Sequence, residues 1–399
     1  MRIGLFGQFG SGNTGNDGSL EAMLQLLKRT CPGAQLICIC ARPEIVSERF
    51  QIDAVPVGQP ASDNAFIRLI NKVLLQFPRR LTGFLGAMSL AQGIDLIIVP
   101  GTGILDDFNE DPFGWPFAVL RWSVAARLTG ARFAFISIGA GPVTHPLSRF
   151  FVRKASMMAV YRSYRDQVSY DFMKSLHMDV AKDVAKDVVS ADIAFALPVV
   201  EDELRNSGDQ RIGLGIMTYK GWKKRAADGA AIYNSYLNKM TELIDELVLE
   251  GRQVRLLTGD MGDLEAVYDL QKRIRAPNLR NVIFEPVASL KNLMEQIAKT
   301  DIVVASRYHN IVCSLSMGRP SISVGYARKN DALLNDTGLG EFCHHIESFN
   351  PQTLLTQIDS MFSRREELGK AVKAGVEIYR ERLAKQEEVL RVHLLQKIS

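Results

Sequence analysis

The stretch GLFGQFGSGNTGNDG, residues 4–18, follows the first apolar run of the chain and ends near the carboxylate of Asp17. An apolar run, a glycine-rich loop and an amphipathic segment in this order are typical of the first strand, turn and helix of a parallel α/β domain. The glycines do not have the G-x-G-x-x-G spacing of a dinucleotide-binding loop, and no P-loop lysine follows them. This leaves two interpretations: glycines that only permit tight turns, or backbone N–H groups that face an anion or a sugar at a helix N-terminus.

Asn13 and Asp17 are the side chains of this loop that can carry chemistry. An asparagine at this place can hydrogen-bond sugar hydroxyls. Asp17 can cap the following helix or act as a base for a sugar hydroxyl, and the sequence alone favours the cap.

Short apolar runs alternate with amphipathic stretches along most of the chain, which indicates βα units and parallel sheets. A polar, acidic segment at 200–210 interrupts this pattern, and we expect two Rossmann-like domains, 1–200 and 201–399, that face each other across a cleft. Residues 362–399 have helical spacing and dense opposite charges, which predicts one or two solvated terminal helices. The predicted strands are Arg2–Phe6, Gln35–Cys40, Asp95–Val99, Arg132–Ile138, Val160–Tyr164, Arg211–Met217, Val254–Thr258, Asn281–Phe284, Asp301–Ala305 and Ser321–Val324.

Composition excludes several classes of protein. The chain has 399 residues, 47% hydrophobic and 23% charged, with a net charge of +4, so we expect no general nucleic-acid binder. Five cysteines without metal-type spacing indicate free thiols in a reducing compartment. No apolar run reaches about 18 residues, and we expect a cytoplasmic protein.

The segment SRYHN, residues 306–310, holds the most informative polar side chains. Arg307 and His309 follow the apolar run DIVVA and precede an apolar helix, so both belong to the turn at the end of a strand. A guanidinium fork suits phosphate or carboxylate, and an imidazole titrates near neutral pH. Arg307 pairing with a carboxylate of the other domain is the structural alternative. Other basic candidates follow strands at Arg165, Lys329 and, more weakly, His145.

The order of these motifs resembles the polysaccharide pyruvyl transferase family. The resemblance covers roughly residues 3–345 and rests on the opening loop, PGTGILDD, GAGP, RDQVS, ADIAF and SRYHNIVCSLSMGRPSISVGYARK. Two features depart from the family pattern: Tyr308 stands where an aliphatic residue is usual, and Asn16 is an extra residue before Asp17.

The resemblance implies a GT-B-like fold and transfer of a pyruvyl group from phosphoenolpyruvate to two sugar hydroxyls as a cyclic ketal. It implies a sugar of a cell-surface polysaccharide, or its lipid-linked precursor, as acceptor. His309 is then the candidate acid, Arg307 the catalytic anion partner and Asp17 the candidate base, with Asp107 as the second choice. This chemistry requires no metal and no cofactor. The donor side comprises Arg165, Lys329, His145, Gly139 and Gly141, and the acceptor side Gly10, Gly12, Asn13 and Asp107.

Two other functions remain open at this point. A GT-B glycosyltransferase that uses a nucleotide sugar would show the same βα pattern, and a non-catalytic sugar- or phosphate-binding regulator would use the same basic residues. A further expectation is peripheral contact with anionic lipid at the inner membrane face, through a basic, apolar segment that carries Arg68, Lys72, Arg79 and Arg80. The alternative there is a helix that packs on the core with a solvated basic side.

Overall fold

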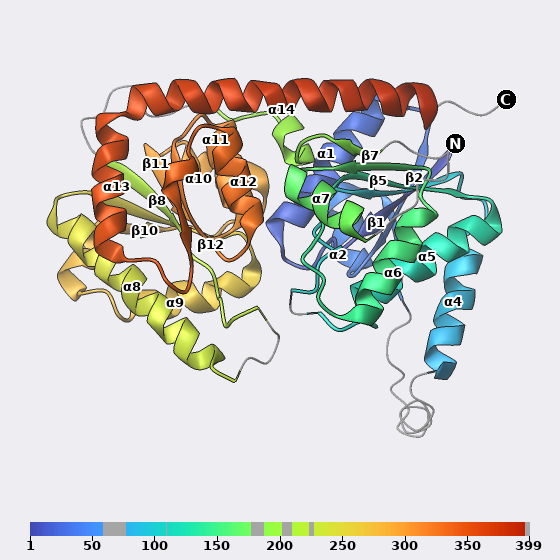
Figure 1. Ribbon diagram of the computed structural model, residues 1–399, viewed down its shortest axis with the longest axis horizontal. Coiled ribbons are helices and arrows are strands. Elements are labelled where there is room, and N and C mark those ends of the chain that lie inside the picture. The colour runs from blue at the N-terminus through green and yellow to red at the C-terminus, as the bar shows by residue number, and fades with distance from the viewer. Residues whose placement is uncertain (59–76, 109, 177–186, 202–209, 223–226, 396–399) are drawn as a thin grey trace. The chain divides into compact units, whose positions relative to one another are not determined.

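The structure is a computed structural model that describes residues 1–58, 77–108, 110–176, 187–201, 210–222 and 227–395 (Figure 1). The chain forms two compact units. Unit 1 comprises Met1–Ser11, Ser19–Ile193 and Lys385–Ser399, and unit 2 comprises Gly12–Gly18 and Ala194–Ala384. The main change from one unit to the other therefore falls at Ile193, and the end of the glycine-rich stretch, Gly12–Gly18, belongs to unit 2.

Unit 1 is built on a parallel sheet in which seven strands lie within the described residues, in the order β3-β2-β1-β4-β5-β6-β7. Because β1 lies between β2 and β4, the chain leaves the middle of the sheet in both directions, which is the doubly wound arrangement. The strands are β1 (Arg2–Gly7), β2 (Gln35–Cys40), β3 (Asp53–Pro56), β4 (Leu96–Pro100), β5 (Arg132–Ile138), β6 (Tyr161–Tyr164) and β7 (Asp187–Val189).

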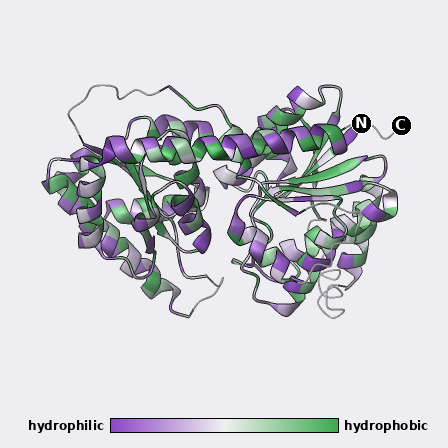
Figure 2. Cartoon of the chain, turned by 45° about the horizontal axis from the view of Figure 1, so that its top comes forward, coloured by the Kyte–Doolittle hydropathy of each residue, from purple (hydrophilic) through white to green (hydrophobic). Residues whose placement is uncertain are grey.

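Helices cover the apolar faces of this sheet. Alternate residues of β1, β2, β4 and β5 form one core with the inner sides of α4, α5 and α6, around the buried Trp122. In Figure 2 the strands of unit 1 are mostly green, as expected for strands buried on both faces. The helices are α1 (Thr14–Thr30), α2 (Pro43–Phe50), α4 (Phe77–Ala91), α5 (Trp115–Thr129), α6 (Pro146–Met157) and α7 (Gln167–Ser175).

Unit 2 repeats the same winding. Its parallel strands within the described residues have the order β10-β9-β8-β11-β12-β13, with β8 next to β11 in the middle. The strands are β8 (Arg211–Gly215), β9 (Gln253–Leu257), β10 (Val282–Phe284), β11 (Ile302–Ala305), β12 (Ser321–Gly325) and β13 (Cys343–His345). The helices are α8 (Gly229–Leu249), α9 (Leu264–Gln271), α10 (Leu290–Ile297), α11 (Tyr308–Ser316), α12 (Arg328–Asp336), α13 (Pro351–Ser363) and α14 (Arg365–His393).

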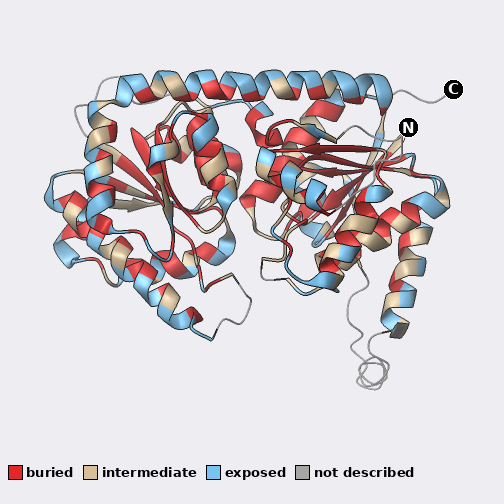
Figure 3. Ribbon diagram, in the orientation of Figure 1, coloured by how far each residue is buried: buried red, intermediate tan, exposed pale blue. Residues whose placement is uncertain are grey.

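The expected α/β class with two parallel-sheet domains is confirmed. The prediction for the C-terminal segment needs a correction, because α14 is not solvated all round. Its residues Leu368, Val372 and Val376 are buried in unit 2, and Leu390 is buried in unit 1. Figure 3 shows the resulting alternation of buried and exposed residues along this helix.

Candidate functional site

The carboxyl ends of β8 and β11 are the place where unit 2 can hold a ligand. In an open parallel sheet, ligands bind beyond the carboxyl ends of the two strands whose connections run in opposite directions. Here those strands are β8 and β11, and the turn after β11 is SRYHN. The fold therefore places the most informative motif of the sequence at this position.

Arg307 forms a bidentate ion pair with Asp263 beside this edge. Its Nε lies 2.9 Å from Asp263 Oδ2, and its Nη2 lies 2.6 Å from Oδ1. Asp263 is fully buried, and its oxygens also accept hydrogen bonds from the backbone N–H groups of Thr218 and Gly259. Burial of the guanidinium disfavours its charge, but the charge of Asp263 and the hydrogen bonds to it hold the pKa of Arg307 above its ordinary value.

This pair changes the expected role of Arg307. The sequence offered a carboxylate of the other domain as the structural alternative, and the carboxylate found lies in the same unit, 44 residues away. The pair uses Nε and Nη2, so Asp263 holds one edge of the guanidinium and Nη1 takes no part in the pair.

The first turn of α1 is fastened to the loop after β9. The Asn13 side chain donates from Nδ2 to Asp260 Oδ2 at 3.1 Å, and its Oδ1 accepts from the backbone N–H groups of Gly15 and Asn16. Thr14 donates from its backbone N–H and its hydroxyl to the Gly259 carbonyl. All these residues belong to unit 2. The Asn13 amide is thus engaged in capping α1 and in joining two loops.

Asp17 is not the helix cap that the sequence favoured. Asn13 occupies the cap, and Asp17 follows in the first turn of α1, where its backbone N–H donates to the Asn13 carbonyl. The Asp17 carboxylate is buried, with 3% of the residue exposed. A carboxylate in the first turn of a helix lies at the positive end of the helix dipole, which stabilises its charge.

His309 lies against Gly15. A Cβ built on Gly15 would be 1.9 Å from His309 Nδ1, so only glycine permits this approach. Tyr308, which stands where the family has an aliphatic residue, is 5% exposed, and its ring meets the imidazole edge to face at 5.3 Å. The imidazole is thereby packed between the first turns of α1 and α11.

Lys329 lies at the neighbouring strand end, after β12. Its Nζ is 5.3 Å from the ring centroid of Tyr326, and Tyr326 stacks on Tyr219 from the loop after β8. The Tyr219 hydroxyl donates to Glu347 Oε1 at 2.7 Å, and burial together with this carboxylate raises the pKa of Tyr219. Lys329 therefore lies on an aromatic surface at the edge that also carries Arg307.

Asn310 is a polar residue of this edge that the sequence reasoning did not single out. It is fully buried in the first turn of α11, and within the described residues neither its Oδ1 nor its Nδ2 has a hydrogen-bond partner. Gly215 and Gly259 leave the space that the amide occupies, since a Cβ on either would come within 3 Å of it. In the sequence, Gly215 at the end of β8 and Gly259 just after β9 were the signal that could have indicated a buried side chain at this edge.

A second group of candidates lies in unit 1. Arg165, at the carboxyl end of β6, is buried and pairs with Asp166 at 3.3 Å and with Asp192 at 3.4 Å. Its guanidinium lies where a Cβ on Gly139 would be, at 2.5 Å from Cζ. The two acids belong to the RDQVS and ADIAF segments of the motif series, but the sequence reasoning gave them no role.

Asp107 and His145 lie together. Asp107 Oδ2 accepts hydrogen bonds from the backbone N–H and hydroxyl of Thr144, at 2.6 and 2.7 Å, and from the backbone N–H of His145 at 3.2 Å. His145 Nδ1 in turn accepts from the Leu147 N–H and caps α6. In this structure both side chains hold the loops after β4 and β5 in place.

Three of the candidate glycines have backbone reasons to be glycine. Gly10, Gly12 and Gly141 have φ values of +71°, +97° and +75°, which other residues rarely adopt.

The candidate residues divide between the two units. Within unit 2, those near the carboxyl edge of the sheet, or on the loops joined to it, are Gly12, Asn13, Asp17, Arg307, His309 and Lys329. Within unit 1 the loops after the strands carry Gly10, Asp107, Gly139, Gly141, His145 and Arg165.

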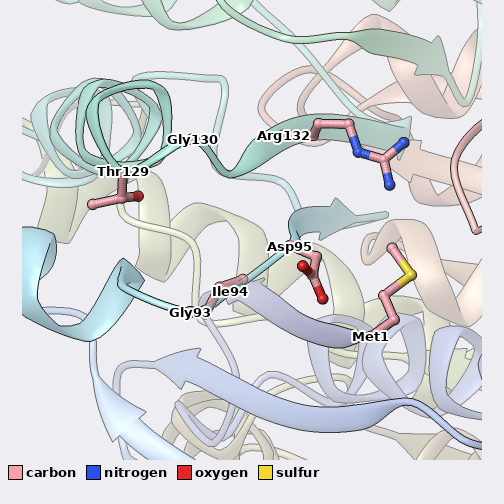
Figure 4. A pocket seen from close by; sticks show the side chains of 7 residues that line it. All are labelled: Met1, Gly93, Ile94, Asp95, Thr129, Gly130 and Arg132. Atoms are coloured by element: carbon pink, nitrogen blue, oxygen red, sulfur yellow. The ribbon is translucent and has the colours of Figure 1, made fainter. Parts of the chain in front are cut away.

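A pocket of about 580 Å³ lies at the opposite edge of the unit 1 sheet (Figure 4). Its lining comes from the segments that enter β1, β4 and β5, including Asp95 and Arg132. Asp95 accepts a hydrogen bond from the Arg2 N–H, and Arg132 donates to the Leu394 carbonyl. These groups join strands to one another and to the end of α14. None of the candidate residues lines this pocket.

Among the described residues, no three His, Cys, Asp or Glu side chains are grouped so that they could hold a metal ion. None of the helices in the described ranges combines the length and the apolar character that crossing a bilayer requires.

The fold is that of GT-B enzymes, with two doubly wound α/β domains. Similar solved structures include S. aureus MnaA in complex with UDP (TM-score 0.64, 10% identity, 100% of this chain and 99% of that one). The UDP-GlcNAc 2-epimerase from Methanocaldococcus jannaschii has a TM-score of 0.59 at 12% identity, with 90% and 92% covered. A glycosyltransferase from Rickettsia africae has 0.57 at 14% identity, with 100% and 99% covered. At these identities the likeness shows the fold alone.

The family follows from the sequence. The profile of the polysaccharide pyruvyl transferases matches residues 13–328, from the Asn13 cap to the start of α12, and the chain belongs to this family. Comparison with curated proteins gives no match.

Proposed function

We propose that the protein transfers a pyruvyl group from phosphoenolpyruvate to two hydroxyls of a sugar, which becomes a cyclic ketal. The acceptor is a sugar of a cell-surface polysaccharide or of its lipid-linked precursor. Family membership supports the class of reaction. The observation that carries the proposal is the arrangement of Arg307 and His309 in one turn after β11, beside the first turn of α1.

Phosphoenolpyruvate needs an anion-binding group for its phosphate and carboxylate. Arg307 offers Nη1 while Asp263 holds the rest of its guanidinium, so little side-chain entropy is lost when a ligand binds. Lys329 adds a positive charge at the same edge of unit 2. We assign Arg165 of unit 1 to the donor as well, with Asp166 and Asp192 fixing its orientation.

His309 is the proposed acid. It donates a proton to the methylene carbon of phosphoenolpyruvate, which leaves C2 with oxocarbenium character. A first sugar hydroxyl forms a bond to C2 and gives its proton to a carboxylate, for which we propose Asp17. The second hydroxyl then bonds to C2 and gives its proton to His309, which restores the acid. At the same time the bond from C2 to the phosphate oxygen breaks, and inorganic phosphate leaves with the proton that Asp17 had taken up. This scheme uses phosphoenolpyruvate as a substrate and assigns no role to a metal or cofactor.

The second candidate function is a glycosyltransferase that uses a nucleotide sugar. It is favoured by the fold, because one similar structure contains UDP and another, Anabaena Alr3699/HepE, is in complex with UDP and glucose. The Arg307, His309 and Lys329 cluster would then bind a diphosphate rather than phosphoenolpyruvate.

A thermal-shift panel and a phosphate assay separate the two functions. We expect phosphoenolpyruvate to raise the melting temperature and UDP or GDP to leave it unchanged, since a ligand at 100 times its Kd stabilises the folded state by about 2.7 kcal/mol. Phosphate release from phosphoenolpyruvate should require a glycan. Stabilisation by UDP alone, with no phosphate released across a broad glycan panel, would favour the glycosyltransferase.

A further inference from the structure

The outer surface of α4, α5 and α6 in unit 1 has an unusual charge composition. These three helices carry two, two and three basic residues and no acidic residue. They pack side by side on one face of the sheet, with α5 in contact with both neighbours (Figure 1). The longer helices α1, α8 and α14 carry charges of both signs. The positive charge of this layer is therefore local and not a property of the whole chain.

Large apolar side chains are exposed on the same helices and on the loop before α5. Their exposed fractions lie between 38% and 56%, and Figure 3 shows exposed residues along the outer sides of α4 and α6. These side chains are Leu81 and Leu85 on α4, Phe113 before α5, and Phe150 and Met157 on α6.

The basic and apolar groups form one continuous surface. The Arg80 guanidinium carbon lies 3.5 Å from the ring centroid of Phe113, and Phe113 meets Phe151 at 5.8 Å. Phe151 meets Phe150 at 5.9 Å, and Lys154 Nζ is 5.8 Å from the Phe150 ring. Contacts thus connect α4 to α6 through the exposed rings of Phe113 and Phe150, each with a cation beside it, and the buried ring of Phe151 between them.

Two acids, Glu110 and Asp111, lie in the loop that precedes α5. Glu110 Oε2 accepts a hydrogen bond from the Trp115 N–H at the start of α5, so its charge faces the positive end of that helix.

We propose that this surface docks the protein on an anionic lipid bilayer. Exposed aromatic and aliphatic side chains enter the boundary between headgroups and acyl chains, and the adjacent cations meet the lipid phosphates. A nucleic acid would use the cations but has no contact to offer Leu81, Leu85 and Met157. The proposal is independent of the donor chemistry, because none of these residues belongs to the candidate site. Of the basic segment predicted from the sequence, Arg68 and Lys72 lie outside the described residues, and Arg79 and Arg80 lie on α4.

The test is co-sedimentation of the full chain with vesicles of phosphatidylcholine alone or mixed with phosphatidylglycerol. We expect binding only to the mixed vesicles at low salt, and release near 1 M salt, where the screening length is about 3 Å. Each basic residue near an anionic surface contributes about fivefold. Replacing Arg79, Arg80, Arg153 and Lys154 by Gln should therefore reduce the partition coefficient by at least about 100-fold.

Two further variants make the result specific. The matched control replaces Lys272, Lys291, Lys370 and Arg380 by Gln; these exposed cations of unit 2 give the same change in net charge, and binding should fall by less than about threefold. Phe113→Ser with Phe150→Ser keeps all charges and should lower the partition coefficient about tenfold, since apolar burial is lost. Circular dichroism verifies that each variant is folded.

Equal losses in the patch and control variants would refute the docking surface, because net charge alone would then explain binding. Failure of the wild-type chain to sediment with the mixed vesicles would also refute it. Binding to a DNA duplex but not to vesicles would assign the surface to a nucleic acid instead.

Discussion

Replacing Arg307 by Ala tests how much its ion pair with Asp263 stabilises unit 2. The substitution removes both hydrogen bonds to Asp263, at 2.9 and 2.6 Å, and leaves a fully buried carboxylate with only the Thr218 and Gly259 N–H groups. Loss of one partner of a buried ion pair costs about 3–5 kcal/mol. For a unit of this size we expect the melting temperature to fall by roughly 6–20 °C.

The double variant Arg307→Ala, Asp263→Asn isolates the coupling between the two groups. It removes the unpaired charge, so it should be more stable than Arg307→Ala by about 1–3 kcal/mol. The matched control is Lys370→Ala, which breaks an exposed pair with Glu366 on α14 and should cost less than about 0.5 kcal/mol. Urea titrations followed by circular dichroism give these values from the shift of the midpoint at constant m.

Two outcomes would refute this reasoning. If Arg307→Ala lies within about 1 kcal/mol of the wild type, the buried pair does not stabilise unit 2. If it is destabilised but binds phosphoenolpyruvate with unchanged affinity, Nη1 does not contact the donor; we expect a loss of roughly 2 kcal/mol in binding. Affinity is measured by calorimetry at a temperature where the variant is folded.

His309→Gln should retain donor binding in the thermal-shift assay while phosphate release falls by about two to four orders of magnitude, and normal turnover would exclude His309 as the acid. Gly15→Ala places a methyl group where His309 Nδ1 lies, so turnover should fall at least about tenfold, with little further loss in the His309→Gln background. Unchanged turnover in Gly15→Ala would contradict the packing of the imidazole. Burial and the neighbouring Asp331 raise the pKa of Cys343 to about 12, which favours the protonated thiol. Its alkylation by iodoacetamide should therefore accelerate about tenfold per pH unit up to that pKa, and Asp331→Asn should speed it at pH 8; a plateau below pH 10 would disprove the shift.

The central strands of both sheets could be predicted from the sequence because parallel strands are buried on both faces and appear as continuous apolar runs. β3, β7 and β13 have four, three and three residues, lie at or near the edges of the sheets, and include polar or exposed positions, so no apolar run marks them. α14 carries many charged residues, and the sequence analysis therefore missed its buried apolar side. The buried residues follow one another at three- and four-residue steps: Leu368, Val372, Val376, Tyr379 and Leu383.

The sequence allowed the residue types of the candidate site to be predicted, but not the carboxylates that pair with its arginines. A strand-end arginine and histidine were visible in SRYHN, because their position follows from local periodicity alone. Asp263 is 44 residues from Arg307, and Asp192 is 27 residues from Arg165. Such partners are set by the order of strands in the sheet, which a single sequence does not show. The cap of α1 is a different case. Asn13 is a suitable cap by residue type, but the sequence favoured Asp17, which lies four residues further along the chain.

The glycines of the opening loop show why residue type alone leaves their purpose open. Gly12 needs its positive φ, as a turn residue does, whereas Gly15 and Gly18 lie inside α1, where each costs about 1 kcal/mol relative to Ala. Glycine is nevertheless required at both positions because a side chain would collide with a neighbour. A Cβ on Gly15 would lie 1.9 Å from His309 Nδ1, and a Cβ on Gly18 would lie 2.1 Å from Leu290 Cδ1 on α10. The first turn of α1 is therefore shaped for close approach to α10 and α11 within unit 2. This approach fixes the His309 ring in place, and it is the feature that most directly connects the glycine-rich loop to the proposed proton transfer.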